Sequence, residues 1–158
     1  MDIREEVPIK SFSIAAYICR IEDGRARFLV IKRQTSYLPD SWQTVSGKIE
    51  EGEKAWEAAL REIREETGLV PDRFYSANDV ELFYEVNQNC INLVPVFVGF
   101  VQSDQPVRLS TEHSEHKWVS SEEAGKLLRF DHQKVTMRMI EAKFVKQPPS
   151  EFLRIKIE

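Results

Sequence analysis

The segment from Gly47 to Leu69, GKIEEGEKAWEAALREIREETGL, constrains the fold of this chain more than any other. It predicts one amphipathic helix from about Lys54 to Thr67, because apolar residues recur at spacings of three and four. Gly68 is expected to end the helix, since glycine adopts a positive φ without strain, and Pro71 reinforces the stop. The apolar stripe that must pack on a core consists of Trp56, Ala59, Leu60 and Ile63.

Three glutamates stand together on a neighbouring face of this helix. Glu62, Glu65 and Glu66 are three and four residues apart, so their carboxylates project side by side. Like charges at this spacing cost roughly 0.2–0.5 kcal/mol per pair, and anions in the last turn oppose the helix dipole. A divalent cation over that face removes the conflict, because Mg²⁺ and Mn²⁺ prefer carboxylate oxygens. The alternative is a solvated glutamate-rich face, since glutamate is a good helix former.

The spacing around these glutamates resembles the signature of the Nudix hydrolase family. Gly47 is followed by five residues and Glu53, then by seven residues and Arg61-Glu62-Ile63, one residue and Glu65-Glu66, and one residue and Gly68-Leu69. The resemblance implies an α/β fold, with a mixed β-sheet sandwiched between helices and a central loop-helix-loop that carries the catalytic motif. The order of expected strands and helices alone supports only a single α+β domain.

The resemblance also implies roles for the motif residues. Glu65 and Glu66 are favoured as the principal ligands of Mg²⁺ or Mn²⁺, and Glu62 as general base or shared ligand. The backbone carbonyl of Gly47 is expected to be a further metal ligand. Such a centre hydrolyses a phosphoanhydride by clamping its oxygens and lowering the pKa of bound water.

Charged residues beside the helix extend the candidate site. Arg61 lies one turn before Glu65 and is expected to brace Glu65 or Glu53 by a charge-assisted hydrogen bond. The alternative for Arg61 is a surface partner of Glu57. Glu53 is expected to hold the loop against the helix. Two basic side chains near the site, either contacting substrate phosphates or solvated at the surface, are Arg33 and Lys48.

The polar loop from Ser110 to Lys117 is the second candidate element. Chemistry with two metal ions draws a ligand or base from outside a single helix face, and relatives in the family often carry a functional glutamate here. Glu112 is the first candidate and Glu115 the second. The two histidines of the loop, His113 and His116, suit a hard, oxygen-preferring ion less well. The alternative is a solvated polar loop.

Three functions are compatible with the resemblance. The first is a pyrophosphohydrolase of a nucleoside triphosphate or related substrate, and the run WQTVSGKIEEGE, with Ser46 before the motif glycine, is similar to the branch that hydrolyses dihydroneopterin triphosphate and deoxynucleoside triphosphates. The second is a dinucleoside polyphosphate hydrolase, which Tyr84 mildly supports as a substrate-binding residue. The third is a non-catalytic nucleotide sensor, and the intact set of carboxylates argues against it. The run Phe83-Tyr84-Glu85 counts against ADP-ribose, for which a proline is common there.

Composition and charge exclude other classes of partner. The net charge of −4 is unsuited to a nucleic acid polymer, which calls for a basic patch. The longest apolar run, 94–101, is too short to span a membrane, and Met1 to Lys10 lack the apolar run of a signal peptide. Cys19 and Cys90 have no metal-ligand spacing, which favours free buried thiols in a reducing cytoplasm. We therefore expect a cytoplasmic protein with a small nucleotide-type substrate.

The rest of the chain is expected to complete one domain over residues 1–146. The expected strands are 10–21, 26–32, 42–45, a hairpin of 80–86 and 90–101 with Pro95 at an edge or bulge, and 117–119 after a loop. One helix is expected to start at Ser120 and Ser121 and to end near Leu128. A second is expected from a capping Asp131 to about Val145, with a core stripe of Val135, Met139, Ile140 and Phe144. In the tail, 147–158, the residues from Phe152 to Ile157 alternate like an edge strand. Docking on its own chain, docking on a partner and fraying are left open, and so is a homodimer.

Overall fold

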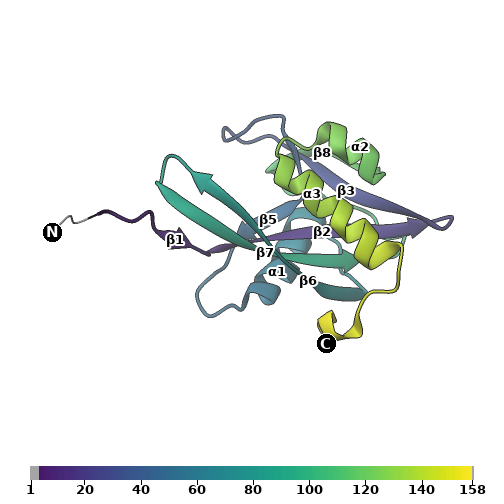
Figure 1. Cartoon of the computed structure of the whole chain (residues 1–158). Coiled ribbons are helices and arrows are strands. Elements are labelled where there is room, and N and C mark those ends of the chain that lie inside the picture. The colour runs from purple at the N-terminus through teal and green to yellow at the C-terminus, as the bar shows by residue number, and fades with distance from the viewer. Residues whose placement is uncertain (1–3, 158) are drawn as a thin grey trace.

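A mixed β-sheet forms the centre of the computed structural model, which describes residues 4–157 (Figure 1). Its strands are β1 (Ile9–Lys10), β2 (Ser13–Glu22), β3 (Arg25–Arg33), β4 (Trp42–Gln43), β5 (Val45–Lys48), β6 (Arg73–Glu85), β7 (Cys90–Phe100) and β8 (His113–Val119). The α-helices are α1 (Ala55–Thr67), α2 (Ser121–Leu127) and α3 (Asp131–Ile140). A π-helical turn (Glu141–Val145) extends α3, and a 3₁₀ turn (Glu151–Leu153) lies in the tail.

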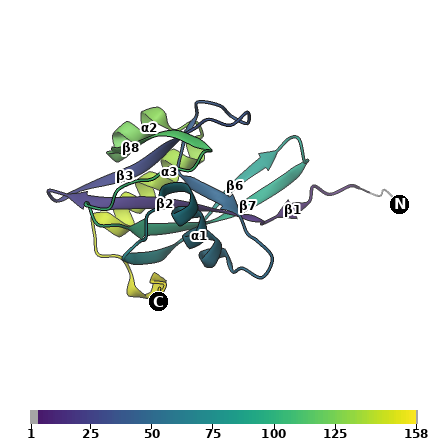
Figure 2. The same ribbon diagram turned by 180° about the vertical axis from the view of Figure 1, so that it is seen from behind.

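The helices cover opposite faces of this sheet. Figures 1 and 2 show α1 on one face and both α2 and α3 on the other. Each face has its own apolar core, one built around Ile63 of α1 and the other around Met137 and Ile140 of α3. The expected sandwich of a mixed sheet between helices is therefore confirmed.

Strand β2 joins the two halves of the sheet. It pairs antiparallel with β3 through Cys19–Glu22 and antiparallel with β5 through Ser13–Ala16, while β7 runs parallel to it on the other side. The pairing with β5 sets Gly47 opposite Ile14. The short strand β5 thus carries the motif glycine into the sheet directly before α1.

The central helix forms where the sequence predicts it. Lys54 is its N-cap, and Gly68 follows it with φ of 72° and donates its N–H to the carbonyl of Arg64 at 2.8 Å. Ala59 and Ile63 are fully buried, whereas Trp56 and Leu60 are half-buried against the same core. Ala58, absent from the predicted stripe, is fully buried as well.

The hairpin of β6 and β7 is longer than the sequence predicts. Strand β6 begins at Arg73, although a strand is predicted only from Val80. It is longer because its residues pair with β7 both before and after an irregularity between Ser76 and Val80. Val80 lies opposite Pro95, so the missing N–H of the proline falls at this bulge. The expectation for Pro95 is confirmed, and the boundary of β6 is corrected.

Three other predictions need correction. Strand β8 begins at His113, within the segment expected to be a loop, because its polar residues pair with β3. Phe130 caps α3 and Asp131 is its first residue. Val135, predicted to be in the core, is 61% exposed, and Met137 is buried there instead. The buried face of α3 is rotated from the predicted stripe.

The tail docks on its own chain without forming the predicted edge strand. Arg154 makes a single antiparallel bridge to Tyr75, and Ile155 donates its N–H to the carbonyl of Phe74 at 2.8 Å. Phe152, in the 3₁₀ turn, is 94% exposed, so the alternating residues have no sheet face to cover.

Two further expectations concern the cysteines and the membrane. Cys19 and Cys90 are buried and free, as the sequence predicts. Within residues 4–157, no helix combines the length and the apolar character that crossing a membrane requires.

Candidate active site

Arg61 of α1 lies at the centre of the candidate site and joins the motif loop to the helix. Its Nε and Nη2 donate to the two carboxylate oxygens of Glu53 at 2.7 and 3.0 Å, and Nη2 also donates to the carbonyl of Lys48 at 2.8 Å. Its Nη1 donates to Glu62 at 2.8 Å and to Glu65 at 3.1 Å. This paired geometry is the strongest that arginine makes with a carboxylate, so the loop is fixed against the helix.

The surface alternative for Arg61 does not occur. Glu57 accepts a hydrogen bond from the backbone N–H of Lys54 at 3.0 Å, as a helix-capping side chain. Glu53 also accepts a hydrogen bond from the N–H of Glu50 at 2.8 Å, which holds the motif loop. The hydrogen bonds from Arg61 keep the pKa of Glu53 below its ordinary value.

The carboxylate of Glu66 is the most unusual group in the site. It is 6% exposed, and its Oε2 has no hydrogen-bond partner among the described residues. The pKa of Glu66 is raised to about 9, first by burial and then by the charges of Glu62 and Glu112. A backbone hydrogen bond from Ser46 and the charge of Arg33 oppose this shift. A carboxylate left so incompletely satisfied is poised for a positively charged ligand.

The other two helix carboxylates are held differently. Burial raises the pKa of Glu62, while Arg61 opposes the shift and the charges of Glu65 and Glu112 add to it. Glu65 is exposed, and Arg61 is its one side-chain partner among the described residues. The helix therefore presents one buried, one half-buried and one exposed carboxylate.

The donor atoms of these side chains are of the chemical type that a hard divalent cation prefers. They are oxygen atoms, the buried Oε2 of Glu66 lacks a partner among the described residues, and the charge of Glu62 makes Glu66 harder to ionise. Among residues 4–157, no three His, Cys, Asp or Glu side chains are gathered closely enough to hold a metal ion. Arg61 binds two of the candidate ligands, Glu62 and Glu65.

The polar loop before β8 separates its two candidate glutamates. Glu112 lies close enough to raise the pKa of both Glu62 and Glu66, and its carbonyl accepts from the N–H of Gln34 at 2.9 Å. Glu115 lies in β8 and pairs with Lys32 at 3.2 Å. The structure therefore brings Glu112, and not Glu115, to the helix carboxylates.

The three candidate substrate-binding residues lie in different surroundings. Arg33 is near enough to Glu66 to lower its pKa. The Lys48 side chain is exposed, while its carbonyl binds Arg61. Tyr84 is 53% exposed near the hairpin turn, and its hydroxyl donates to Asn89 at 2.6 Å. Of the three, the structure links Arg33 and Lys48, and not Tyr84, to the motif residues by a described interaction.

Sequence reasoning missed two residues beside Arg33. Gln43 of β4 accepts from Arg33 Nη1 at 3.3 Å, and its Nε2 lies 2.9 Å from Nε2 of His113. His113 is 3% exposed, although the sequence analysis considered it only as a weak metal ligand. No spacing pattern could have found this pair, because the register of β3 with its two neighbours brings them together.

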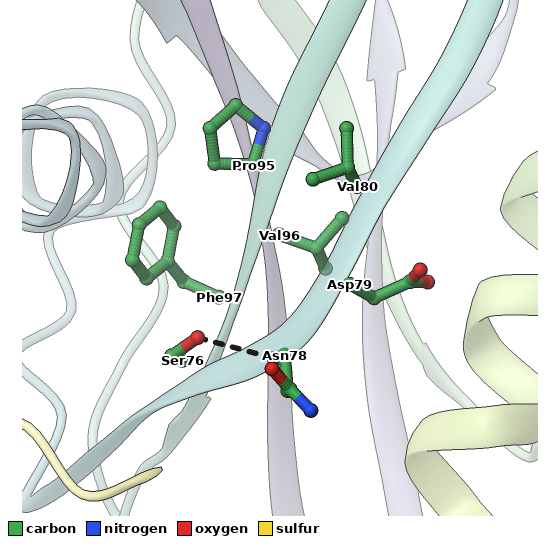
Figure 3. Close-up of a pocket in the computed structure, with 7 residues that line it drawn as sticks. All are labelled: Ser76, Asn78, Asp79, Val80, Pro95, Val96 and Phe97. Atoms are coloured by element: carbon green, nitrogen blue, oxygen red, sulfur yellow. Dashed lines mark hydrogen bonds between the residues drawn. The ribbon is translucent and has the colours of Figure 1, made fainter.

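A cavity of about 440 Å³ lies elsewhere, at the bulge of β6 (Figure 3). Its lining residues are Ser76, Asn78, Asp79, Val80, Pro95, Val96 and Phe97. None of the predicted site residues lines it, so the cavity is separate from the carboxylate site.

Comparisons with known proteins identify relatives of this chain. The bis(5'-nucleosyl)-tetraphosphatase (asymmetrical) of Caenorhabditis elegans is 30% identical over 121 residues, covering 75% of this chain and 86% of the relative. The nucleoside triphosphatase NudI of Klebsiella pneumoniae is 26% identical over 115 residues, covering 67% and 81%. The crystal structure of a C. elegans Ap4A hydrolase binary complex superposes with a TM-score of 0.71 at 25% identity, covering 82% of this chain and 94% of that one.

Both groups of relatives that the sequence analysis weighed are thus represented among the similar proteins. The family model of the NUDIX domain matches residues 12–140, which include every candidate site residue. This chain belongs to the Nudix hydrolase family.

Proposed function

We propose that this Nudix hydrolase cleaves a phosphoanhydride bond in a nucleoside triphosphate or a related nucleoside diphosphate-linked substrate, with Mg²⁺ or Mn²⁺ as cofactor. The observation that carries the proposal is the group of carboxylates beside Arg61, in which Glu66 is buried with one oxygen unpartnered. The relatives support the choice of substrate class, since one is named a nucleoside triphosphatase and another a bis(5'-nucleosyl)-tetraphosphatase.

The residues that would hold the cation are Glu65, Glu66 and Glu112, with the carbonyl of Gly47. When bound, a divalent cation supplies positive charge to the phosphoryl oxygens and lowers the pKa of bound water. Glu66 gives up its proton on binding, because a ligand carboxylate has to be ionised. Its raised pKa therefore makes cation binding weaker at low pH.

Glu62 is the proposed general base. Its raised pKa brings it closer to neutral pH, where a base is both ionised and able to take a proton. Arg61 donates a hydrogen bond to Oε1 of Glu62 and so fixes this carboxylate. Oε2 of Glu62 then remains to receive the proton of the attacking water. Arg33 is proposed to bind the substrate phosphates, since it is the basic side chain beside Glu66.

A second candidate is a dinucleoside polyphosphate hydrolase. The 30% identity to the C. elegans tetraphosphatase supports it. The same cation and base would serve both substrates, because both contain the same bond. The two candidates therefore differ in how the remainder of the substrate is bound.

A substrate panel with identified products tests the proposal. Deoxynucleoside triphosphates, dihydroneopterin triphosphate, diadenosine tetraphosphate and ADP-ribose are incubated with the protein and Mg²⁺. We expect the best turnover with one of the first two, releasing pyrophosphate and a monophosphate. ATP and AMP from diadenosine tetraphosphate, at the highest kcat/KM, would establish the second candidate. Binding of nucleotides without turnover of any of them would reduce the protein to a sensor.

A further inference from the structure

Arg33, Gln43 and His113 form a hydrogen-bonded chain beside the buried carboxylate. The guanidinium donates from Nη1 to Gln43 Oε1 at 3.3 Å, and Gln43 Nε2 lies 2.9 Å from the imidazole Nε2. Strand β3 brings them together, because β4 pairs with it at Ile31 on one side and β8 places His113 opposite Arg33 on the other.

Only one arrangement of protons satisfies this chain. A guanidinium only donates hydrogen bonds, so the oxygen of the Gln43 amide has to face Arg33. The amide NH₂ then faces His113, whose Nε2 has to be the acceptor. The ring proton of the neutral imidazole therefore lies on Nδ1, which is buried and has no partner among the described residues.

These hydrogen bonds orient the guanidinium of Arg33 without pairing it with a carboxylate. Its Nε donates to the hydroxyl of Thr35 at 2.8 Å, and its Cζ lies 5.4 Å from the ring centroid of Tyr37. No carboxylate within residues 4–157 lies within ion-pair distance of Arg33, in contrast to Arg61, which touches four. A guanidinium carries five N–H donors, and the contacts above use two of them. The remaining donors are available to a ligand.

We infer that Gln43 and His113 are positioning residues, and that the relay from the Nδ1–H imidazole through the amide aims the guanidinium of Arg33 at the phosphate oxygens of the substrate. The inference rests on the proposed function for the identity of that ligand. A guanidinium that is already oriented binds a phosphate with two parallel hydrogen bonds and loses little rotamer freedom in doing so. The neutral imidazole suits this purpose, because a charged ring could not accept from Gln43.

The tautomer of His113 tests the relay without any turnover. The chain has three histidines, so the ring nitrogens of ¹⁵N-labelled protein can be assigned from single His variants. We expect His113 to be the Nδ1–H tautomer in the wild type. In Gln43→Glu both side-chain oxygens accept, so His113 has to change to donating from Nε2. His116 and His132 should keep their spectra. An Nε2–H ring in the wild type, or no change in Gln43→Glu, overturns the relay.

The affinity for phosphate tests its purpose. Titration with inorganic tripolyphosphate should give a Kd roughly tenfold higher for Gln43→Met, which has a similar size but neither hydrogen bond. Gln88→Met, at the exposed turn between β6 and β7, is the matched control and should bind as the wild type does. His113→Gln keeps an acceptor near the Nε2 position and should retain affinity, whereas His113→Leu should lose it.

Steady-state kinetics with the best nucleotide should show the same order of variants in KM, with smaller changes in kcat. Equal affinity and equal KM in wild type and Gln43→Met would overturn the inference. A wild type that turns over no nucleotide would instead count against the proposed function, while the tautomer and the tripolyphosphate titration would still decide the relay. If His113→Leu does not fold, the two Gln43 variants carry the test.

Discussion

The carboxyl group of Glu62 lies directly against the backbone of Gly47, so that a Cβ atom at residue 47 would overlap it. Gly47 is not among the glycines with positive φ, and it pairs in register with Ile14 of β2. Its small size is therefore required for space and not for backbone conformation. The glycine lets the strand and the proposed base approach one another more closely than any side chain would allow.

Gly47→Ala should displace Glu62 and lower kcat by about 10²-fold, the range for a lost acid–base group. The strand conformation suits alanine, so circular dichroism should show an intact fold. Gly125→Ala is the control, because an added Cβ at Gly125 has open space around it and alanine favours its helix. Unchanged kcat in Gly47→Ala would mean that Glu62 does not take part in the chemistry.

Glu66 should make the protein less stable as the pH rises when no cation is present. Its pKa is about 9 in the folded state and about 4.3 in an unfolded chain. The folded state therefore binds more protons between these values, and this group lowers the free energy of unfolding by up to about 1.4 kcal/mol per pH unit across that window. Urea unfolding of wild type and Glu66→Gln between about pH 5 and pH 8 measures the difference.

In this comparison the free energy of unfolding of Glu66→Gln should increase relative to that of the wild type as the pH increases. Glu51→Gln, in the exposed motif loop, should follow the wild type at every pH. Parallel curves for wild type and Glu66→Gln would show that Glu66 is ionised in the folded protein.

Removal of divalent cations should abolish turnover, and adding Mg²⁺ or Mn²⁺ should raise the Tm. A ligand that binds only the folded state adds about 2.7 kcal/mol of stability at one hundred times its Kd. Glu65→Gln and Glu66→Gln should lower kcat by about 10²-fold or more and reduce the shift in Tm. Full activity after treatment with a chelator would contradict the proposed cofactor.

Glu112→Gln should raise the Mg²⁺ concentration needed for half-maximal activity or lower kcat strongly, because its charge acts on both Glu62 and Glu66. Glu115→Gln should behave as the wild type does, since Glu115 pairs with Lys32 on β8. A Mg²⁺ titration of each variant makes the comparison. The reverse result would mean that the metal ligand outside α1 is Glu115 in β8 and not Glu112 in the preceding loop.

Arg61→Lys should weaken both the fold and the reaction. Lysine keeps the charge but cannot make the paired bonds to Glu53 while reaching Glu62 and the carbonyl of Lys48. We expect a loss of about 1–2 kcal/mol in the free energy of unfolding and a kcat lower by roughly tenfold. Arg64→Lys, exposed on the same helix, is the control in both urea unfolding and kinetics.

Local signals were enough to predict α1 and its surroundings. Gly68 and the spacing of Ile63 from its apolar neighbours act within a few residues, and both features are found as predicted. The beginning of β6 could not be predicted in this way. Its first residues gain their strand conformation from pairing with β7, across a bulge where Asn78 adopts a φ of 55°. The register between β6 and β7 cannot be inferred from a single sequence.

In the candidate site, too, the residues of one element could be predicted and those brought together by strand pairing could not. The carboxylates on α1 follow from helical periodicity, because one helix carries them all. The surroundings of Arg33 depend on strands from three separate parts of the chain, so Gln43 and the buried state of His113 were missed. Val135 was misplaced for a related reason, since the rotation of α3 is set by the sheet beneath it and not by its own sequence.

The docked tail has a consequence for solubility. Strand β6 pairs with β7 on one side only within the described residues, so its outer backbone groups form an open edge. Edges of this kind recruit strands from other molecules and begin aggregation unless something blocks them. The bridge from Arg154 to Tyr75 and the hydrogen bond from Ile155 to Phe74 occupy this edge at the end where the strand packs into the cores. The docked tail thus keeps this end of the β6 edge from pairing with a strand of another molecule.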